Sequence, residues 1–236
     1  MGHIKTKDVL KDVYNRLLDY YGPQHWWPAD DPFEMMVGAV LTQNTSWGNV
    51  EKAIKKLKEK GLLCPDKIRT TPLEVVEEAV RSSGYYKNKA IKLKRLAQFL
   101  DENFNDDLEA MSAKDPWELR ADLLSVWGIG PETADSIVLY AAGLPVLVVD
   151  AYTKRMLSRL GICDEKIDYA ACQAIFMDNL PGDAALFNEF HGLIVRHSKD
   201  TCKKTPVCLS CPLLEICPSE QSGLPIGTGP NPISVI

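Results

Sequence analysis

The sequence predicts an all-α protein, and three observations support that fold class. Apolar residues recur at helical spacing along most of the chain, and those near its start are Val9, Leu10, Val13, Leu17 and Leu18. Glycines separate these apolar segments, as they commonly do at helix ends. The one strand-like run, PVLVV at 145–149, is too isolated to build a sheet.

The expected helices begin with 6–20, which carries the apolar stripe just described, and 32–42, a short apolar helix opened by Pro32 in its first turn. Five more follow at 46–60, 72–82, 87–103, 115–126 and 132–142, punctuated by Gly61, Gly84, Gly128 and Gly143. The last three are 151–160, 168–179 and 183–198, and the apolar face of 183–198 consists of Leu186, Phe187, Phe190, Leu193 and Ile194. The tail 218–236 is rich in proline and glycine, so we expect it to be irregular.

The 236 residues allow one large domain or two small ones, and 45% of them are apolar, which is typical of a folded globular protein. The polar start MGHIKTKDVL is unlike a secretory signal, and no apolar run approaches the roughly 20 residues that a membrane span needs. We therefore expect a soluble protein of the cytoplasm. Its formal charge of −5 excludes a bulk basic field, so any nucleic-acid binding must be local.

The stretch VWGIGPETADS, residues 126–136, joins helices 115–126 and 132–142 by a tight turn and predicts a helix–hairpin–helix. Gly128 and Gly130 leave the backbone open to close approach by a ligand. Free amides at the start of the second helix, with the positive end of the helix dipole behind them, suit a phosphate. Such a site reads no base and needs little net positive charge. An ordinary glycine–proline connection between helices explains the same residues.

A lone aspartate, Asp150, follows the apolar run 145–149 and opens helix 151–160. Aspartate is a favoured N-cap, so a capping role alone accounts for it. At that position its pKa is expected to be lowered and its side chain to stay ionised. An ionised carboxylate also stabilises the oxocarbenium character that develops on a sugar when an N-glycosidic bond breaks. Both roles stay open from the residue alone.

Four cysteines fall close together near the C-terminus, and three others are isolated at Cys64, Cys163 and Cys172. The clustered ones are Cys202, Cys208, Cys211 and Cys217. In an intracellular protein such a cluster favours a metal site over a disulfide framework. Structural zinc more often uses two separated C-x2-C pairs, whereas proline often follows iron–sulfur ligands, as it follows Cys211 and Cys217 here. The residues themselves leave an iron–sulfur cluster and zinc as the two alternatives.

Together these motifs resemble the endonuclease III superfamily of DNA glycosylases, from about residue 30 to residue 217. The resemblance implies a six-helix barrel domain at 29–145 that contains the hairpin (115–142), and a second domain formed by 1–28 and 146–217 with the cysteine loop 202–217. In this superfamily DNA lies across the cleft, and the damaged base is flipped out of the duplex stack. The expected activity is base excision repair by a monomer acting on double-stranded DNA that contains a damaged base.

The resemblance also implies residue roles. Asp150 is the expected catalytic residue, and Gln43 matches the glutamine that fills the hole left by the flipped base. The hairpin residues expected to contact DNA are Gly128, Ile129, Gly130 and Thr133. A [4Fe-4S] cluster is expected on Cys202, Cys208, Cys211 and Cys217, although the first gap is five residues here rather than the usual six. Gln43 is equally well explained as a buried amide at a helix end.

One departure from the superfamily decides the expected mechanism. Members that also cut the strand carry a lysine two residues after the second hairpin glycine, and this lysine forms a Schiff base. Here that position is Glu132, and a glutamate cannot form an imine with the sugar. Asp150 is therefore expected to act with water, which makes the protein a monofunctional glycosylase without lyase activity.

The tryptophans near the start of the chain predict the class of base. Two adjacent tryptophans cannot easily both point into one core, but their faces can stack a flipped base. The spacing of WWP, LTQNT and a further tryptophan, with FHG and SK at 190–199, resembles the bacterial 3-methyladenine glycosylases. That resemblance implies a base pocket of Trp26, Trp27, Pro28, Trp47 and Lys199, suited to electron-poor alkylated purines. Those glycosylases lack the cysteine cluster and carry a lysine where this chain has Leu193.

Two other functions stay open at this point. One is a mismatch or oxidised-pyrimidine glycosylase, with or without lyase activity, and the other is a non-catalytic iron–sulfur protein that binds DNA. The basic runs 52–60 and 87–95 are interpreted as solvated helix faces or as DNA contacts. Lys203 and Lys204 are expected to face phosphates, and His191 is interpreted as a structural hydrogen-bonding residue.

Overall fold

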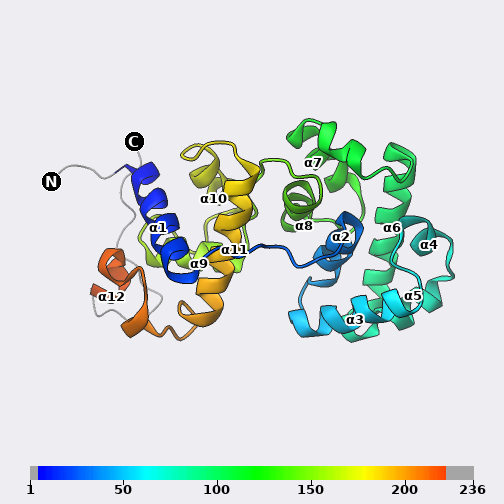
Figure 1. Cartoon of the computed structure of the whole chain (residues 1–236), viewed down its shortest axis with the longest axis horizontal. Coiled ribbons are helices and arrows are strands. Elements are labelled where there is room, and N and C mark those ends of the chain that lie inside the picture. Colours follow the sequence, from blue (N-terminus) through cyan, green and yellow to red (C-terminus); the bar gives the residue numbers. More distant parts are fainter. Residues whose placement is uncertain (1–4, 222–236) are drawn as a thin grey trace. The chain divides into compact units, whose positions relative to one another are not determined.

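The computed structural model describes residues 5–221, and the regular structure within this range is helical throughout (Figure 1). Because these residues contain no β-strand, the predicted all-α fold class is confirmed. Most of the expected helices occur within two residues of their expected bounds. They are α1 (Thr6–Tyr21), α2 (Pro32–Leu41), α3 (Trp47–Glu59), α6 (Tyr86–Phe104), α7 (Pro116–Ser125), α9 (Ala151–Arg159), α10 (Tyr169–Met177) and α11 (Ala184–Asp200).

Two expected helices are interrupted. The segment 72–82 divides into α5 (Leu73–Ala79) and a 3-10 turn, η1 (Arg81–Ser83). The segment 132–142 is α8 (Pro131–Ser136) continued by a π-helical turn, η3 (Ile137–Ala141). Sequence analysis missed α4 (Pro65–Thr70) and the 3-10 turn η2 (Glu109–Ala113), because segments of five or six residues are too short to display a helical period.

The expectation of an irregular tail at 218–236 is wrong at its start, because Pro218–Gln221 forms the short helix α12. Proline is well tolerated in the first turn of a helix, where its missing N–H has no intrahelical partner. The rest of that tail, 222–236, lies outside the described residues. The cysteine loop before α12 contains two 3-10 turns, η4 (Cys208–Ser210) and η5 (Leu214–Ile216).

The chain divides into two compact units. We call Trp27–Pro145 the hairpin unit, and we call the described residues up to Trp26 together with those from Val146 onward the terminal unit. The expected boundary after residue 28 lies two residues from the observed division after Trp26. The expected boundary after residue 145 coincides with the observed division.

The hairpin unit is organised around α2. Nine of its ten residues, from Phe33 to Leu41, are buried, so this helix is enclosed on all sides. It packs against α3, α6, α8 and η3, which lie around it in Figure 1. Its start is well defined, because Asp31 caps it by accepting a 2.9 Å hydrogen bond from the backbone N–H of Glu34.

The terminal unit has its core between α1, α9 and α11, which pack pairwise with α11 in common (Figure 1). The α1 stripe of Leu10, Val13 and Leu17 is fully buried, and the rings of Tyr14 and Phe190 meet edge to face at 5.3 Å. Within residues 5–221, none of the helices combines the length and the apolar character that crossing a membrane requires.

Candidate functional site

The hairpin turn combines a buried residue, Ile129, with two half-exposed glycines, Gly128 and Gly130. Gly128 has φ +87, a conformation that favours glycine, and the N–H of Ile129 closes the turn on the carbonyl of Val126 at 3.1 Å. Ile129 is only 5% exposed and anchors the turn in the hairpin unit. Gly130 is the N-cap of α8, and Pro131 occupies the first helical turn.

Gln43 joins the hairpin to the loop after α2. Its Nε2 donates to Thr133 Oγ1 at 2.9 Å and to the carbonyl of Gly128 at 3.3 Å, and its Oε1 accepts a hydrogen bond from Lys92 Nζ. The Lys92 stem lies against the hairpin so closely that a Cβ on Gly128 would stand 2.6 Å from its carbons. Sequence analysis missed Lys92, because one lysine in a basic helix carries no distinguishing signal.

Three aromatic side chains gather in the hairpin unit. The Trp27 ring meets Trp47 edge to face at 5.3 Å and lies 5.5 Å from Tyr140. Gly38 makes room for this group, because a Cβ there would lie 3.3 Å from Trp27 Nε1. Pro28, which follows Trp27 in the sequence, is exposed. Of the proposed pocket residues, the structure therefore groups Trp27 with Trp47 and adds Tyr140.

Trp26 belongs to the terminal unit. Its Cβ would be 2.9 Å from a Cβ on Gly192, so this glycine of α11 lets Trp26 lie close to the helix. Lys199 Nζ stands over the Trp26 ring, 5.6 Å from its centroid, which is a cation–π distance. The two adjacent tryptophans thus belong to different units.

Asp150 caps α9. Its Oδ1 accepts hydrogen bonds from the N–H of Thr153 at 2.7 Å and from Thr153 Oγ1 at 2.9 Å, and its Oδ2 lies 3.7 Å from His191 Nε2. The side chain is 14% exposed. Burial opposes ionisation, but the His191 imidazole and the Thr153 donors outweigh it and lower the pKa of Asp150 below its ordinary value. His191 is therefore placed to act on the charge of Asp150, which sequence analysis did not anticipate.

The backbone that leads to Asp150 is held by α10. The buried run of 146–149 forms no strand, and α10 supplies its hydrogen-bonding partners instead. Gln173 Nε2 donates to the carbonyl of Leu147 at 2.6 Å, and the N–H of Val149 donates to Tyr169 Oη at 3.3 Å. These bonds fix the direction in which the chain enters the cap.

The four clustered cysteines line one cavity of about 270 Å³ in the terminal unit, together with Arg159 and His197. Arg159 Nη1 donates to Cys202 Sγ at 3.1 Å, and His197 Nε2 lies 3.9 Å from Cys211 Sγ. Burial lowers the pKa of His197 to about 4, so this imidazole is neutral near pH 7. Lys203 and Lys204 are exposed on the loop.

The arrangement of these thiols bears on which metal group fits. Within the described residues, no three His, Cys, Asp or Glu side chains converge as a site for a single ion. The four cysteines instead stand around a void. A tetrahedral zinc needs its ligands at one point, whereas each iron of a [4Fe-4S] cube takes one thiolate, so the sulfurs surround the cluster. The four cysteines therefore fit a [4Fe-4S] cluster better than a single zinc ion.

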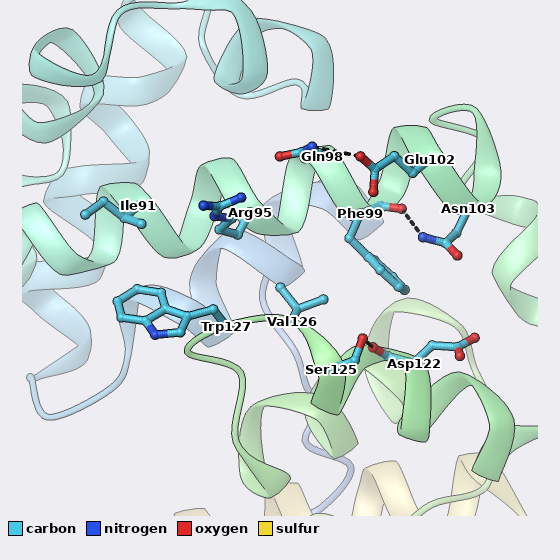
Figure 2. A pocket seen from close by; sticks show the side chains of 10 residues that line it. All are labelled: Ile91, Arg95, Gln98, Phe99, Glu102, Asn103, Asp122, Ser125, Val126 and Trp127. Carbon is cyan, nitrogen blue, oxygen red and sulfur yellow. Dashed lines mark hydrogen bonds between the residues drawn. The ribbon is translucent and has the colours of Figure 1, made fainter.

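A second hollow, of about 620 Å³, lies in the hairpin unit between α6 and the end of α7 (Figure 2). Trp127, 57% exposed and adjacent to Gly128, lies on the same side of the hollow as Val126 and below Arg95. Its lining also includes the carboxyl groups of Glu102 and Asp122, so its charge does not favour a phosphate. Sequence analysis did not anticipate this groove.

Residues 37–181 match the family described as "HhH-GPD superfamily base excision DNA repair protein". The chain belongs to this superfamily. It is a DNA glycosylase of base excision repair, and the helix–hairpin–helix predicted from the sequence is part of the matched region. The Methanocaldococcus jannaschii protein provisionally named DNA repair glycosylase MJ1434 is 48% identical over 214 residues, which is 90% of this chain and 97% of that protein.

More distant relatives extend the comparison in two directions. Endonuclease III of Bacillus subtilis is 28% identical over 192 residues, or 81% of this chain and 83% of that enzyme. The H. pylori 3-methyladenine DNA glycosylase MagIII, solved with 1,N6-ethenoadenine, is 33% identical with a TM-score of 0.71 and covers 83% of this chain and 98% of its own. Endonuclease III in a trapped covalent intermediate with DNA is 27% identical with a TM-score of 0.79. The match covers 93% of this chain and 99% of that one.

Proposed function

We propose that this glycosylase hydrolyses the N-glycosidic bond of an alkylated purine, such as 3-methyladenine, in double-stranded DNA inside the cell, and leaves the strand intact. The observation that carries the proposal is the ionised carboxylate of Asp150, held at the start of α9 by Thr153 and His191. Capping of α9 uses only the Oδ1 atom of Asp150. The Oδ2 atom, which faces His191, is not needed for the cap. A negative charge fixed in position is suited to a cation that develops on the sugar.

In the proposed reaction the base departs with the electron pair of the glycosidic bond. The Asp150 carboxylate stabilises the positive charge left at C1′, and a water molecule adds to that carbon. The water gives its proton to the carboxylate or to the released base. Alkylation already weakens the bond in such purines, so strong protonation of the leaving group is not required.

The strand stays intact because no lysine stands at the hairpin position that forms a Schiff base in lyases. Glu132 occupies that position in the first turn of α8 and is exposed. Two other amines could replace such a lysine, but Lys154 Nζ donates to the carbonyl of Ile167 at 2.6 Å, and Lys199 lies over Trp26. Both amines are engaged within the terminal unit.

Two groups of residues are proposed to hold DNA. The hairpin backbone at Gly128, Ile129 and Gly130 binds a phosphate, with Thr133 beside it on α8. Gln43 fills the gap left by the flipped base. In the present structure its amide is bonded to the hairpin, so occupying the gap requires those hydrogen bonds to exchange.

The base is proposed to be recognised by indole faces and by Pro28 and Lys199. Electron-poor alkylated purines stack well on the electron-rich indoles of Trp26, Trp27 and Trp47. The complex of H. pylori MagIII with 1,N6-ethenoadenine supports this class of base, because that base is also a modified adenine.

We further propose that a [4Fe-4S] cluster is held by Cys202, Cys208, Cys211 and Cys217. Its chemistry here is thiolate coordination, which closes the loop between α11 and α12. Arg159 and His197 contact two of the sulfurs and orient them. Zinc is the alternative occupant. The enzyme is proposed to act as a monomer.

The test is release of bases from methylated duplex DNA, with the products identified by chromatography. Free 3-methyladenine and an abasic strand that breaks only after alkali are expected. Borohydride added during the reaction is expected to trap no enzyme on the DNA, because trapping requires an imine. Strand breaks formed at the same rate as base release would overturn the monofunctional mechanism.

A second candidate is an endonuclease III-like glycosylase for oxidised pyrimidines or mismatches, favoured by the similarity to the B. subtilis enzyme. Duplexes carrying one such lesion distinguish the two. Their turnover, in the absence of any release from methylated DNA, would replace the proposed substrate.

A further inference from the structure

The hairpin unit buries one lysine, Lys89, almost completely. Lys89 lies on α6 and is 2% exposed. Its ammonium donates to two backbone carbonyls, that of Leu41 at 2.8 Å and that of Ser83 at 2.6 Å. Each carbonyl belongs to the last residue of a helical segment, Leu41 to α2 and Ser83 to η1. Sequence analysis placed Lys89 in a basic run and did not anticipate its burial.

Keeping a positive charge at this position costs free energy. A buried ammonium loses its hydration, and this burial lowers the pKa of Lys89 to about 8. An apolar side chain of similar volume would fill the same space without that cost. The α2 carbonyl gives a reason for the cation, because the last carbonyls of a helix lack intrahelical partners and the helix dipole favours positive charge there.

The charge that acts on the pKa of Lys89 comes from Lys92, three residues along α6, and it acts in the same direction as burial. The elements packed against α6 are α2, α4, α5 and η1. Their charged side chains are Glu34 on α2, Asp66, Lys67 and Arg69 on α4, Glu74, Glu77 and Glu78 on α5, and Arg81 on η1. Glu34 forms its ion pair with Lys58, and Arg81 forms its own with Glu78.

Lys89 holds the end of α2 that leads into Gln43. Leu41 is the last residue of α2, and Gln43 follows it by two residues. The Oε1 atom of Gln43 accepts a hydrogen bond from Lys92. Because residues three apart on a helix are neighbours on its surface, Lys89 and Lys92 lie on one side of α6. One ammonium therefore holds the helix end, and the other holds the amide that follows it.

We propose that Lys89 is a positioning residue for Gln43, because its ammonium fixes the end of α2 from which Gln43 reaches the gap left by a flipped base. The proposal rests on the role proposed above for Gln43. A buried side chain does not touch DNA, so Lys89 acts through the backbone of α2. Without its charge the hydrogen bonds to the two carbonyls weaken, and so does the interaction with the helix dipole.

Lys94, on the same helix, provides a matched control. Its ammonium also donates to two carbonyls, those of Arg69 at 3.0 Å and of Thr71, at the end of α4. No residue of α4 is proposed to bind DNA. Lys89→Met and Lys94→Met therefore each remove an ammonium from two carbonyls and keep an apolar stem. Both variants should fold, with thermal midpoints lowered by on the order of 4 °C.

The experiment uses the full chain and measures two dissociation constants near pH 7. One is for a duplex with a tetrahydrofuran abasic analogue, which presents the gap and undergoes no base release, and the other is for the same duplex undamaged. Their ratio is the lesion selectivity. Lys89→Met should lower this selectivity by about tenfold and leave the Kd for undamaged duplex unchanged. Lys94→Met should retain the selectivity. Equal losses in the two variants, or full selectivity in Lys89→Met, would overturn the proposal.

The dependence of this selectivity on pH separates positioning from packing. Lys89 loses its proton as the pH rises through about 8, so the selectivity of the unaltered protein should fall between about pH 7 and pH 9. Lys89→Met has no proton to lose there, and its lower selectivity should stay constant. Burial also lowers the pKa of Lys92. A fall that persists in Lys89→Met would assign the titration to Lys92 and contradict the proposal.

Gln43→Ala separates this proposal from the function on which it rests. This variant should lose lesion selectivity, and adding Lys89→Met to it should cause no further loss, because the two residues act through one contact. A further loss in the double variant would overturn the positioning role of Lys89 alone. Full selectivity in Gln43→Ala would overturn the role of Gln43, and the present proposal with it. If the unaltered protein shows no lesion selectivity, the proposed function itself is wrong.

Discussion

At the scale of single residues, the proposed chemistry depends on how the surroundings of Asp150 set its charge. A buried carboxyl ordinarily resists ionisation, since burial raises its pKa. Thr153 offsets this with two hydrogen bonds to one oxygen, and His191 acts on the other oxygen from 3.7 Å. One carboxylate oxygen of Asp150 therefore caps α9, and the other faces His191. Substitutions can remove the negative charge and keep the cap.

Asp150→Asn tests the charge. The amide oxygen still accepts from the N–H of Thr153, so stability should change by less than about 1 kcal/mol. Base release should fall by at least about 100-fold, because the amide carries no negative charge. Thermal melting and release of base from methylated duplex DNA measure the two effects. Near-normal turnover in this variant would remove Asp150 from the mechanism.

His191→Phe tests the control of that charge through pH. His191 lowers the pKa of Asp150, so without the imidazole burial dominates and the pKa rises. The carboxyl is then protonated, and inactive, at a higher pH than before. The acid limb of the rate profile should therefore move to higher pH, whereas rates at alkaline pH should change little. An acid limb that stays in place would show that His191 has only a packing role.

At the scale of elements, a side chain of α6 packs against the hairpin and is linked to it by hydrogen bonds. The Lys92 stem lies against Gly128, and its ammonium holds the Gln43 amide, which in turn bonds Gly128 and Thr133. The turn whose backbone is proposed to bind a phosphate is thus supported by side chains of two other segments.

The two hairpin glycines should differ when each is replaced by alanine. Gly128 has φ +87 and no room for a Cβ, so Gly128→Ala should cost about 1–2 kcal/mol and lower the thermal midpoint by roughly 4 °C. Gly130 has φ −95 and no atom within 4 Å of an added Cβ. Gly130→Ala should leave stability unchanged but weaken binding of duplex DNA, because the methyl group stands where the phosphate approaches. Equal stability of the two variants would contradict this account of the turn.

Lys92→Met keeps the stem that packs on Gly128 and removes the ammonium. The protein should fold normally, but Gln43 loses its donor and the Kd for lesion-containing duplex should rise by roughly tenfold, or about 1.4 kcal/mol. Lys87→Met is the control, since it removes the same charge from an exposed position of α6. If both substitutions raise the Kd equally, Lys92 contributes to binding through its positive charge alone and not by positioning Gln43.

At the scale of the whole molecule, the two units have different sources of stability. The hairpin unit has a continuous apolar core around α2. The terminal unit ends in a loop of short 3-10 turns, η4 and η5, whose cysteines surround a cavity and not a packed core. A group bound in that cavity is expected to contribute directly to the stability of this unit.

The purified protein should therefore be brown, with broad absorbance near 400 nm and iron bound in the ratio of a four-iron cluster. Cys211→Ser should lose this colour and lower the melting temperature of the terminal unit before that of the hairpin unit. Cys64→Ser, outside the loop, should change neither. A colourless protein that contains stoichiometric zinc would show that the loop is a zinc site.

The sequence by itself determined the helical class, most helix positions and the residue types of the site. These follow from local rules, since helical periodicity, glycine turns, N-caps and cysteine spacing are properties of neighbouring residues. It did not reveal α4, η2 or α12, because elements of four to six residues display no period.

Only the tertiary structure decided which distant side chains meet. His191 reaches Asp150, and Lys92 holds Gln43. A lone histidine and a lysine in a basic helix look ordinary in the sequence. Their roles depend on the packing of helices far apart in the chain. That packing is driven by burial of apolar faces, and the hydrophobic effect is non-directional, so an apolar face in the sequence does not identify the helix against which it packs.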